Sequence, residues 1–254
     1  MMLSVTKLML KQSFRYRGRI VSDIVNVILR GIILIFFAQA FASNKSTAKG
    51  FGLTAMILLM IVSEAMRGGA NFFRSQEYYG TFYRIFATPA NRVLLVLASS
   101  SASLIMIFVE IFPLLLIGYL LGYTIIPGIL FRLTLFSARL SIFGFAMLIS
   151  PVGIAVKNIT GPLINIIQTL INLIAGVLIP LRILPHSLQE LALLMPFTHA
   201  FEAFRGVTVY SRSTSKILIE SLKAVIGGLI MLAMSSVIIK YAERRAMEYG
   251  YERL

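Results

Sequence analysis

Six long apolar runs constrain what this chain can fold into. An α-helix needs about 20 apolar residues to cross the hydrocarbon core of a bilayer, and a spanning segment must satisfy its backbone polar groups internally. The runs occupy residues 20–42, 51–71, 93–121, 129–156, 162–181 and 223–241 of the 254-residue sequence. They predict an all-α integral membrane fold with six transmembrane helices in one domain, residues 1–254.

The composition favours a membrane protein over a soluble one. Hydrophobic residues make up 58% of the chain and charged residues only 13%, whereas soluble domains are about half apolar and about a quarter charged. A single soluble core of this size cannot bury so much apolar surface. The net charge of +14 comes from basic residues between the apolar runs, which is typical of topology signals and lipid contact rather than of a nucleic-acid site.

Lys and Arg are distributed unequally between the connections. Most of those outside the apolar runs lie in the N-terminal segment, the connection between runs two and three, and the C-terminal segment. Six spans place these three segments on the same side, and basic connections remain preferentially in the cytoplasm. We therefore predict a multi-pass protein of the cytoplasmic (inner) membrane with both termini in the cytoplasm.

The N-terminal segment, residues 1–19, has the pattern of an amphipathic interface helix. Lys7, Lys11 and Arg15 recur every four residues, which places them on one helical face. A helix with one basic and one apolar face lies in the plane of the membrane interface. The pattern fits a lipid anchor that sets orientation, and it also fits a lever that touches a cytoplasmic partner.

The connection between the second and third runs is rich in aromatic residues. Tyr79, Phe82 and Phe86 have the spacing of one helical face, and Pro89 is expected to end that helix near Thr88. A short amphipathic helix at the cytoplasmic face suits docking into a groove of a partner. The alternative is an aromatic belt at the headgroup level, which needs no partner.

This connection resembles the inner loop of the type-2 ATP-binding-cassette (ABC) exporter permeases. The shared pattern is an acidic residue, a Gly-Thr pair, apolar positions, an Ala-Thr-Pro triplet and a basic residue, here Glu77, Gly80, Thr81, Phe82, Ile85, Ala87, Thr88, Pro89 and Arg92. In that family the loop forms a coupling helix seated on the ATPase subunit. The resemblance implies that the ATPase subunit is contacted by Glu77, Tyr79, Gly80, Phe82, Tyr83, Arg84 and Phe86, and by Lys7, Lys11 and Arg15 of the N-terminal helix.

A second part of the resemblance lies between the fifth and sixth runs, in residues 182–206. An apolar stripe that includes Leu188 and Leu191 is bounded by prolines and is too short to cross a bilayer. In the family this region forms two short re-entrant helices that dip into the outer leaflet. The residues of this outer segment that we single out are Pro180, Pro185, Pro196, Thr198, His199, Glu202 and Arg205. The family more often has Tyr where this chain has His199, which we interpret as a hydrogen-bonding residue rather than a catalyst.

Several charged side chains lie inside the apolar runs. Glu110 belongs to the third run, and Arg132 and Arg139 belong to the fourth. Because an unpaired charge at membrane depth is costly, we expect these residues to face each other or a polar cavity. They would then form a structural ion pair or handle a substrate or proton. Glu64 and Arg67, three residues apart, are expected to pair locally.

Other polar residues inside the runs have less definite roles. Asn165, Gln168 and Asn172 give the fifth run a polar face, which serves either a transport pathway or helix packing. Arg30 in the first run has no evident partner in the sequence.

The sequence lacks the motifs of several chemistries. It has no cysteine and only two histidines, which excludes thiolate sites and leaves too few histidines for a metal site of their own. It also lacks the Gly-x-x-x-x-Gly-Lys-Ser/Thr loop that cradles nucleotide phosphates. We therefore expect no cofactor in this chain and no catalytic activity of its own.

The resemblance implies the membrane subunit of an ATP-driven exporter. Two copies of a separate ABC ATPase would hold ATP and Mg, and two permease chains, as a homodimer, would form the substrate route. Alternating access would move a drug, a lipid or a (poly)saccharide out of the cytoplasm.

Two alternative functions stay open. One is an ion-coupled secondary transporter that uses Glu110 and the arginines of the fourth run. The other is an intramembrane lipid-modifying enzyme, for which His199 and Glu202 form only a small outer cluster.

Overall fold

The structure is a computed structural model that describes residues 17–41, 45–78, 80–81, 85, 91–123, 125–152 and 160–249. These residues form helices and their connections, with no strand among them. The elements are α2 (Arg17–Phe41), α3 (Lys45–Ala65), the π-helix η1 (Met66–Ala70), α4 (Phe72–Tyr78), α6 (Arg92–Leu120), α7 (Ile129–Ile149), α9 (Thr160–Ile174), the 3-10 helix η2 (Leu181–Ile183), α10 (His186–Leu193), α11 (Pro196–Thr208) and α12 (Thr214–Tyr249). The predicted all-α class is confirmed for this part of the chain.

Four helical stretches are long and apolar enough to cross a membrane. They are Ile20–Ala40 in α2, Thr47–Ala70 in α3 and η1, Ile129–Ile149 in α7 and Thr214–Ala242 in α12. Three shorter apolar stretches are Arg92–Ser103 and Val109–Leu120 in α6 and Gly161–Ile174 in α9. The described chain is therefore a multi-spanning helical protein, as the apolar runs predict.

The helix bounds differ from several of the predicted runs. Helix α3 begins at Lys45 rather than at residue 51, and α7 ends at Ile149, whereas the fourth run is predicted to extend to residue 156. The fifth run is predicted to extend to residue 181, but α9 ends at Ile174. Gly176 follows with a positive φ of 78°, a left-handed conformation that ends helices. In contrast, α12 extends beyond the predicted run at both ends and contains 36 residues. The predicted interface helix covers residues 1–19, and residues 1–16 of it lie outside the described residues.

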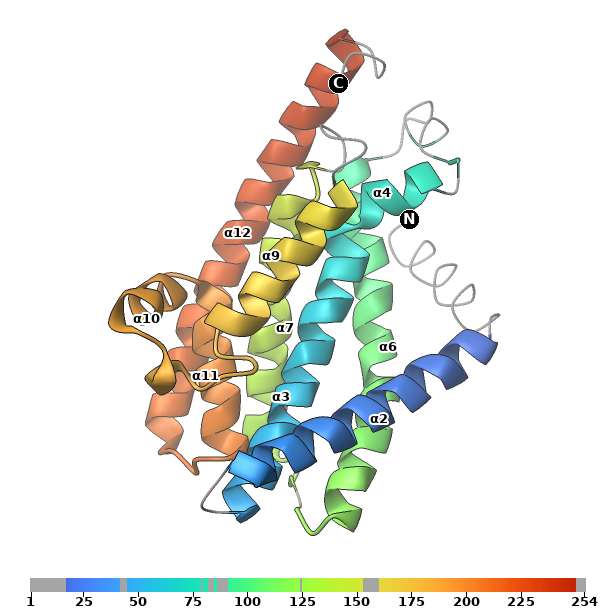
Figure 1. The fold of residues 1–254 in the computed structure, drawn as a ribbon. Coiled ribbons are helices and arrows are strands. Elements are labelled where there is room, and N and C mark those ends of the chain that lie inside the picture. Colours follow the sequence, from blue (N-terminus) through green and yellow to red (C-terminus); the bar gives the residue numbers. More distant parts are fainter. Residues whose placement is uncertain are drawn as a thin grey trace.

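Helix α3 forms the centre of the bundle. In its most apolar stretch 78% of the residues are buried, compared with 17% for α2 and 22% for α12. It packs against α2, α6, α7, α9 and α11, and Ile57 and Ile61 are fully buried. Helix α2 runs obliquely across the bundle (Figure 1) and exposes apolar side chains such as Ile33 and Phe37. Such a face suits contact with lipid or with another apolar protein surface.

The backbones of helices α7 and α12 lie in direct contact at two glycines. A Cβ atom added to Gly144 would lie 2.5 Å from the carbonyl oxygen of Gly228, and one added to Gly228 would lie 2.8 Å from the Cα atom of Ser141. A larger side chain at either position would therefore push the helices apart. Small residues allow this close approach of helices within a membrane.

The two ends of the bundle are built differently. The last turn of α2, the first turn of α3, the last turn of α6 and the α11–α12 connection lie at the lower end in Figure 1, whereas α4 and the last turns of α12 lie at the upper end. Three hydrogen bonds tie the lower end together. Lys49 Nζ donates to the carbonyl oxygen of Leu121 at 2.8 Å. The Tyr123 hydroxyl donates to the carbonyl oxygen of Thr208, and the Thr54 hydroxyl donates to the Thr208 hydroxyl at 2.9 Å. These bonds fix the lower ends of α3, α6 and α11 relative to one another.

Candidate functional site

A polar cavity of about 320 Å³ lies among α2, α3, α6 and α9. Its polar lining consists of Asp23, Asn26, Arg30, Ser63, Glu64, Arg67, Glu110, Gln168 and Asn172. Ionisable side chains inside an apolar bundle are costly and mark pathways for substrates or ions. This cavity is the candidate functional site.

Three residues predicted for a polar pathway line the cavity. They are Glu110 from α6 and Gln168 and Asn172 from α9. Gln168 Nε2 donates a hydrogen bond to Ser63 Oγ at 3.0 Å, which joins α9 to α3. The polar face of α9 therefore both lines a cavity and connects two helices.

The other three predicted pathway residues do not line it. Arg132 is exposed near the start of α7, Arg139 is buried within α7, and Asn165 is exposed on α9. Helix α7 packs mainly on α12 and α11, whereas α6 packs mainly on α3, η1 and α2. The arginines of α7 are for this reason absent from the cavity lining, and their predicted ion pair with Glu110 stays a prediction.

Arg67 joins two acidic residues at the upper side of the cavity. Its Nη2 atom lies 3.0 Å from Glu64 Oε1, and its Nη1 atom lies 3.8 Å from Asp23 Oδ2. The predicted local pair of Glu64 and Arg67 is thus confirmed. The Glu64 side chain is 4% exposed and that of Arg67 is 46% exposed, so the pair extends from the buried interior to the surface. Within the described part of the chain, no three carboxylate or imidazole groups are arranged to hold a metal ion.

The polar face of α2 is the part of the site that sequence reasoning missed. Asp23, Asn26 and Arg30 all line the cavity, although the sequence suggested no partner for Arg30 and no role for Asp23. Their spacing of i, i+3 and i+7 places them on one helical face. This periodicity inside an otherwise apolar run is the signal that could have revealed them.

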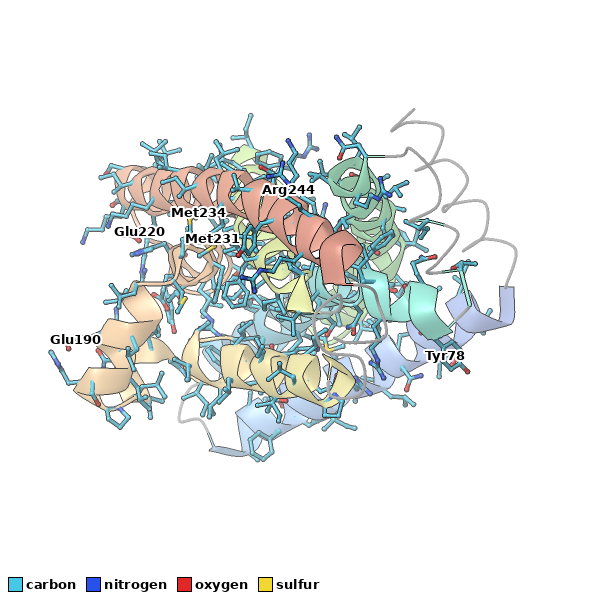
Figure 2. The ribbon with its side chains drawn as sticks, turned by 90° about the horizontal axis from the view of Figure 1, so that it is seen from above. Tyr78, Glu190, Glu220, Met231, Met234 and Arg244 are labelled. Atoms are coloured by element: carbon cyan, nitrogen blue, oxygen red, sulfur yellow. The ribbon has the colours of Figure 1, made fainter. Side chains whose placement is uncertain are left out.

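A second cavity, of about 240 Å³, adjoins the first toward the upper end. It is lined by Arg67, Asn71, Arg74, Ser75 and Tyr78. Arg67 belongs to both linings, so its side chain lies between the two cavities. Tyr78 is 86% exposed and lies at the edge of the bundle in the view from above (Figure 2). Through the second cavity, the polar cavity therefore lies next to the part of the surface that α4 forms.

The π-helix η1 connects α3 to α4 and packs tightly against two other helices. A Cβ atom on Gly68 would lie 2.8 Å from the Cα atom of Ser100 in α6, and one on Gly69 would lie 2.9 Å from the Cβ atom of Ala146 in α7. π-Helical turns are rare and frequently occur at functional sites. Because Arg67 belongs to η1, a shift of this turn would also move the cavity wall.

Helix α4 is anchored by two adjacent buried phenylalanines. The rings of Phe72 and Phe73 meet edge to face, with centroids 5.1 Å apart. They belong to an apolar cluster with Val96 of α6, Phe143 of α7 and Ile239 of α12. Because interiors are closely packed, a displacement of α4 would be transmitted to all three helices.

The predicted ATPase-contact residues lie at the upper end or outside the described residues. Glu77 belongs to α4, and Gly80 is exposed with a φ of 65°. Thr81 Oγ1 donates to Gln76 Oε1 at 2.6 Å, and Ile85 packs against the apolar cluster that anchors α4. Tyr79, Phe82, Tyr83, Arg84, Phe86, Lys7, Lys11 and Arg15 lie outside the described residues. The described part of this connection therefore sits beside α4, close to the second cavity.

Two short helices follow α9. The 8 residues of α10 and the 13 residues of α11 correspond to about 12 Å and about 20 Å of helix, too short to cross a bilayer. Pro180 precedes η2, Pro185 precedes α10, and Pro196 is the first residue of α11, a position where its missing N–H costs no helix bond. Helix α11 packs against the lower part of α12 (Figure 1).

Arg205 joins α11 to the centre of the bundle. Its side chain is fully buried. Nη2 donates to the carbonyl oxygen of Val177 at 2.7 Å, Cζ lies 4.5 Å from the centroid of the Phe51 ring, and Nη1 lies 4.0 Å from Glu202 Oε1. Burial lowers the pKa of Arg205 to about 10, so the guanidinium group stays protonated at neutral pH.

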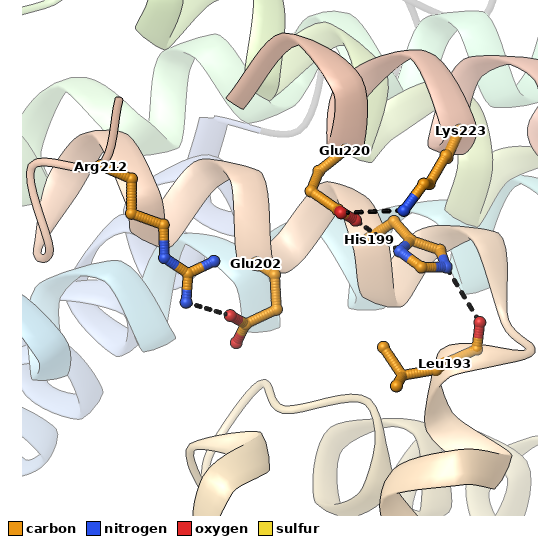
Figure 3. A network of polar contacts seen from close by, with 6 residues as sticks. All are labelled: Leu193, His199, Glu202, Arg212, Glu220 and Lys223. Atoms are coloured by element: carbon orange, nitrogen blue, oxygen red, sulfur yellow. Dashed lines mark hydrogen bonds and ion pairs between the residues drawn. The ribbon is translucent and has the colours of Figure 1, made fainter. Parts of the chain in front are cut away.

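His199 also connects helices, as Figure 3 shows. Its Nδ1 atom lies 2.5 Å from Glu220 Oε2 of α12, and its Nε2 atom lies 2.9 Å from the carbonyl oxygen of Leu193 in α10. Glu220 also accepts a hydrogen bond from Lys223 at 3.0 Å. Thr198, the preceding residue, is buried. These contacts agree with the interpretation of His199 as a hydrogen-bonding residue, and its acidic partner is Glu220 of α12.

Comparison with known protein families covers most of the helices described above. The family model of the ABC-2 type transporter matches residues 4–209, a range that contains α2 to α11 and thus every residue of the polar cavity. The comparison with curated proteins found no match. Because the family match extends over most of the chain, the resemblance noted in the sequence is confirmed. The chain belongs to the ABC-2 type transporter family, and it is a multi-pass membrane permease of that family.

Proposed function

We propose that this chain is the transmembrane subunit of an ATP-driven exporter whose ATP hydrolysis takes place on a separate subunit. The family match supports the permease role, and the absence of a nucleotide-binding loop from the sequence supports a separate ATPase. The observation that carries the proposal is the connection from α4 through η1 to Arg67, which lies between the two cavities.

We further propose that six segments cross the membrane: α2, α3 with η1, α6, α7, α9 and α12. Helix α9 alone is about 22 Å long, shorter than the roughly 30 Å of the hydrocarbon core. The segment that follows it, from Ala175 to Pro180, would complete the crossing. Ala175, Gly176 and Val177 are buried, as non-helical backbone at membrane depth must be.

The upper end would face the cytoplasm, with both termini on that side. The excess of Lys and Arg in the corresponding connections supports this orientation. The lower end would then face outward, and α10 and α11 would be re-entrant helices in the outer leaflet. The membrane would be the cytoplasmic (inner) membrane.

The polar cavity would form one half of a substrate route between two copies of the chain. Helices α2 and α9 both line it, and both also expose apolar side chains, such as Ile33 and Leu170. A second copy placed against these faces would cover them and close the route. Two ATPase subunits holding ATP and Mg would bind the upper end, at the connection after α4 and at the N-terminal segment. The cargo would be a drug, a lipid or a (poly)saccharide.

The coupling step would be a rigid-body movement. Closure of the ATPase subunits would displace α4, and Phe72 and Phe73 would transmit that displacement to α6, α7 and α12. The turn of η1 would shift Arg67 relative to Asp23 on α2. The two states would thus differ in their ion pairs, and a ligand shifts an equilibrium only through such differential contacts.

The acidic side chains of the cavity favour a second candidate function. Asp23, Glu64 and Glu110 lie inside an apolar bundle, where carboxylates can serve proton or ion coupling. An ion-coupled secondary transporter would use them without any ATPase.

Transport by inside-out vesicles distinguishes the two candidates. Vesicles containing the chain and its ABC ATPase would be given a cationic dye, a labelled phospholipid or a labelled lipid-linked saccharide. We expect uptake of one probe that requires MgATP and the ATPase, and no uptake by vesicles that contain the chain alone under a pH gradient. Gradient-driven uptake without the ATPase would reject the exporter in favour of the secondary transporter.

A further inference from the structure

An apolar cavity of about 600 Å³ lies between α2, α3 and the segment after α9. Its lining includes Phe37 and Ala38 of α2, Phe51 and Ala55 of α3, and Ile183 of η2. None of its lining residues belongs to the polar cavity. The volume falls within the range of about 300–1,000 Å³ that is common for ligand pockets. An almost entirely apolar wall suits a hydrocarbon chain.

A basic pocket of about 650 Å³ lies at the same end of the bundle. It is lined by Arg182, Arg212, Ser213, Lys216, Ile219 and Glu220. Arg212 is paired with Glu202 at 2.7 Å, and Glu220 is bonded to Lys223 and His199 (Figure 3). Arg182 and Lys216 have no carboxylate within ion-pair distance among the described residues. The pocket therefore keeps an excess of positive charge.

Tyr210 forms a wall between the apolar cavity and the basic pocket. Its side chain lines the apolar cavity. The Cζ atoms of Arg182 and Arg212 lie 5.8 Å and 5.3 Å from the centroid of its ring, and both arginines line the basic pocket. Cation–π contacts of this kind attract guanidinium groups to the face of an aromatic ring. The two spaces consequently adjoin, one suited to hydrocarbon and the other to anions.

The backbone of the α11–α12 connection fixes this arrangement. Ser211 has a φ of 46°, and the amide of Arg212 donates to the carbonyl oxygen of Gly206 at 2.9 Å. The chain thereby folds back over the last turn of α11. A Cβ atom on Gly206 would lie 3.2 Å from Arg212 Cδ, so the arginine side chain rests directly on that turn. The position of Arg212 beside Tyr210 is built into the fold.

We infer that this end of the bundle binds an anionic lipid, with an acyl chain in the apolar cavity and an acidic headgroup on Arg182, Arg212 and Lys216. A phosphate group accepts charge-assisted hydrogen bonds from guanidinium and ammonium groups, while the acyl chain leaves water for an apolar wall. A free anion would explain only the basic pocket, and a neutral apolar ligand would explain only the cavity. Placement of the lipid in the outer leaflet rests on the proposed orientation, whereas binding itself does not.

Lipid binding to the purified full-length chain in neutral detergent tests this inference, with native mass spectrometry as the readout. The probes are phosphatidylglycerol, phosphatidylcholine and glycerol phosphate, the last of which has the anion without the acyl chains. We expect phosphatidylglycerol to bind about tenfold more tightly than phosphatidylcholine because of its headgroup contacts. We expect glycerol phosphate to compete only weakly.

Three variants separate the two halves of the site. Replacing Arg182→Gln together with Lys216→Gln should remove most of the preference for phosphatidylglycerol. Ala38→Phe should weaken the binding of both lipids, because the added ring would occupy the apolar cavity. Arg132→Gln is the matched control: it removes an exposed arginine near the start of α7 that lines neither space. Melting curves of all variants verify that they are folded.

Two results would overturn the inference. Equal affinity for both lipids, unchanged by the double variant, would remove the role of the basic pocket. Full competition by glycerol phosphate, with no effect of Ala38→Phe, would reduce the site to one for free anions. The assay uses neither ATP nor an ATPase, so its failure leaves the exporter proposal standing, and failure of transport leaves lipid binding standing.

Discussion

The guanidinium group of Arg205 lies 4.5 Å from the centroid of the Phe51 ring, and it also donates a hydrogen bond to the carbonyl oxygen of Val177. These contacts join α11, α3 and the segment after α9. Arg205→Met keeps much of the side-chain volume but removes the donor. The buried carbonyl then loses this partner, which costs about 1–3 kcal/mol, and the contact with the ring is lost. We expect a lower melting temperature of the detergent-purified protein.

Arg212→Met is the control for that experiment. Arg212 is paired with Glu202, but its side chain is 24% exposed, whereas that of Arg205 is fully buried, and ion pairs that solvent reaches contribute less to stability. Equal melting temperatures for the two variants would contradict the structural role assigned to Arg205.

The pair of Glu64 and Arg67 permits a double-mutant test. Arg67→Gln removes the cation that lies 3.0 Å from the 4%-exposed side chain of Glu64, and removing one partner of a buried ion pair is destabilising by up to about 3–5 kcal/mol. Glu64→Gln alone should cost less, because Arg67 is partly exposed. We expect the double variant to be more stable than Arg67→Gln, as measured by thermal unfolding. Strict additivity of the two changes would show that the residues do not interact.

The glycines of η1 provide a test of the link between α4 and the cavity. Gly68→Ala would place a Cβ atom 2.8 Å from the Cα atom of Ser100, so α6 or η1 must shift. We expect reduced stability and reduced stimulation of the ATPase by the permease. Gly18→Ala is the matched control, because nothing lies within 4 Å of a Cβ atom there and alanine favours a helix by about 1 kcal/mol over glycine. Normal stimulation by the Gly68 variant would argue against transmission through η1.

Topology can be tested with single cysteines, since the natural sequence has none. Three exposed positions are suitable: Tyr78 after the first two spans, Ile126 between α6 and α7, and Ile183 after α9. With six spans, a membrane-impermeant maleimide added from outside should label Ile126→Cys and Ile183→Cys, and should label Tyr78→Cys only after permeabilisation. The cysteine-free parent gives the background. Labelling of Ile183→Cys only after permeabilisation would mean that α9 does not cross.

The sequence predicts helix class and local pairs better than it predicts which helices meet. The spacing of Glu64 and Arg67 within one helix was enough to predict their contact, because positions three apart share a face. The apolar runs likewise predicted the helices. The end of α9 was missed because Gly176 adopts a left-handed conformation inside an apolar stretch, which hydropathy does not register.

The composition of the cavity depended on packing between helices distant in sequence. Glu110, Gln168 and Asn172 were recognised as polar residues inside apolar runs, but their neighbours Asp23 and Arg30 come from α2. Sequence adjacency suggested α7 as the source of positive charge. In the structure α2 and η1 provide the arginines of the cavity instead, because these elements pack beside α6.

Coupling between the permease and its ATPase is the central claim, and reconstituted transport with simultaneous ATP hydrolysis measures it most directly. Phe82→Asp with Phe86→Asp changes two residues predicted to contact the ATPase, and Tyr119→Asp, an exposed aromatic residue near the lower end of α6, serves as the control. We predict that the double variant folds normally but transports no substrate while ATP hydrolysis continues uncoupled, and that the control transports. Full coupling in the double variant would contradict the account.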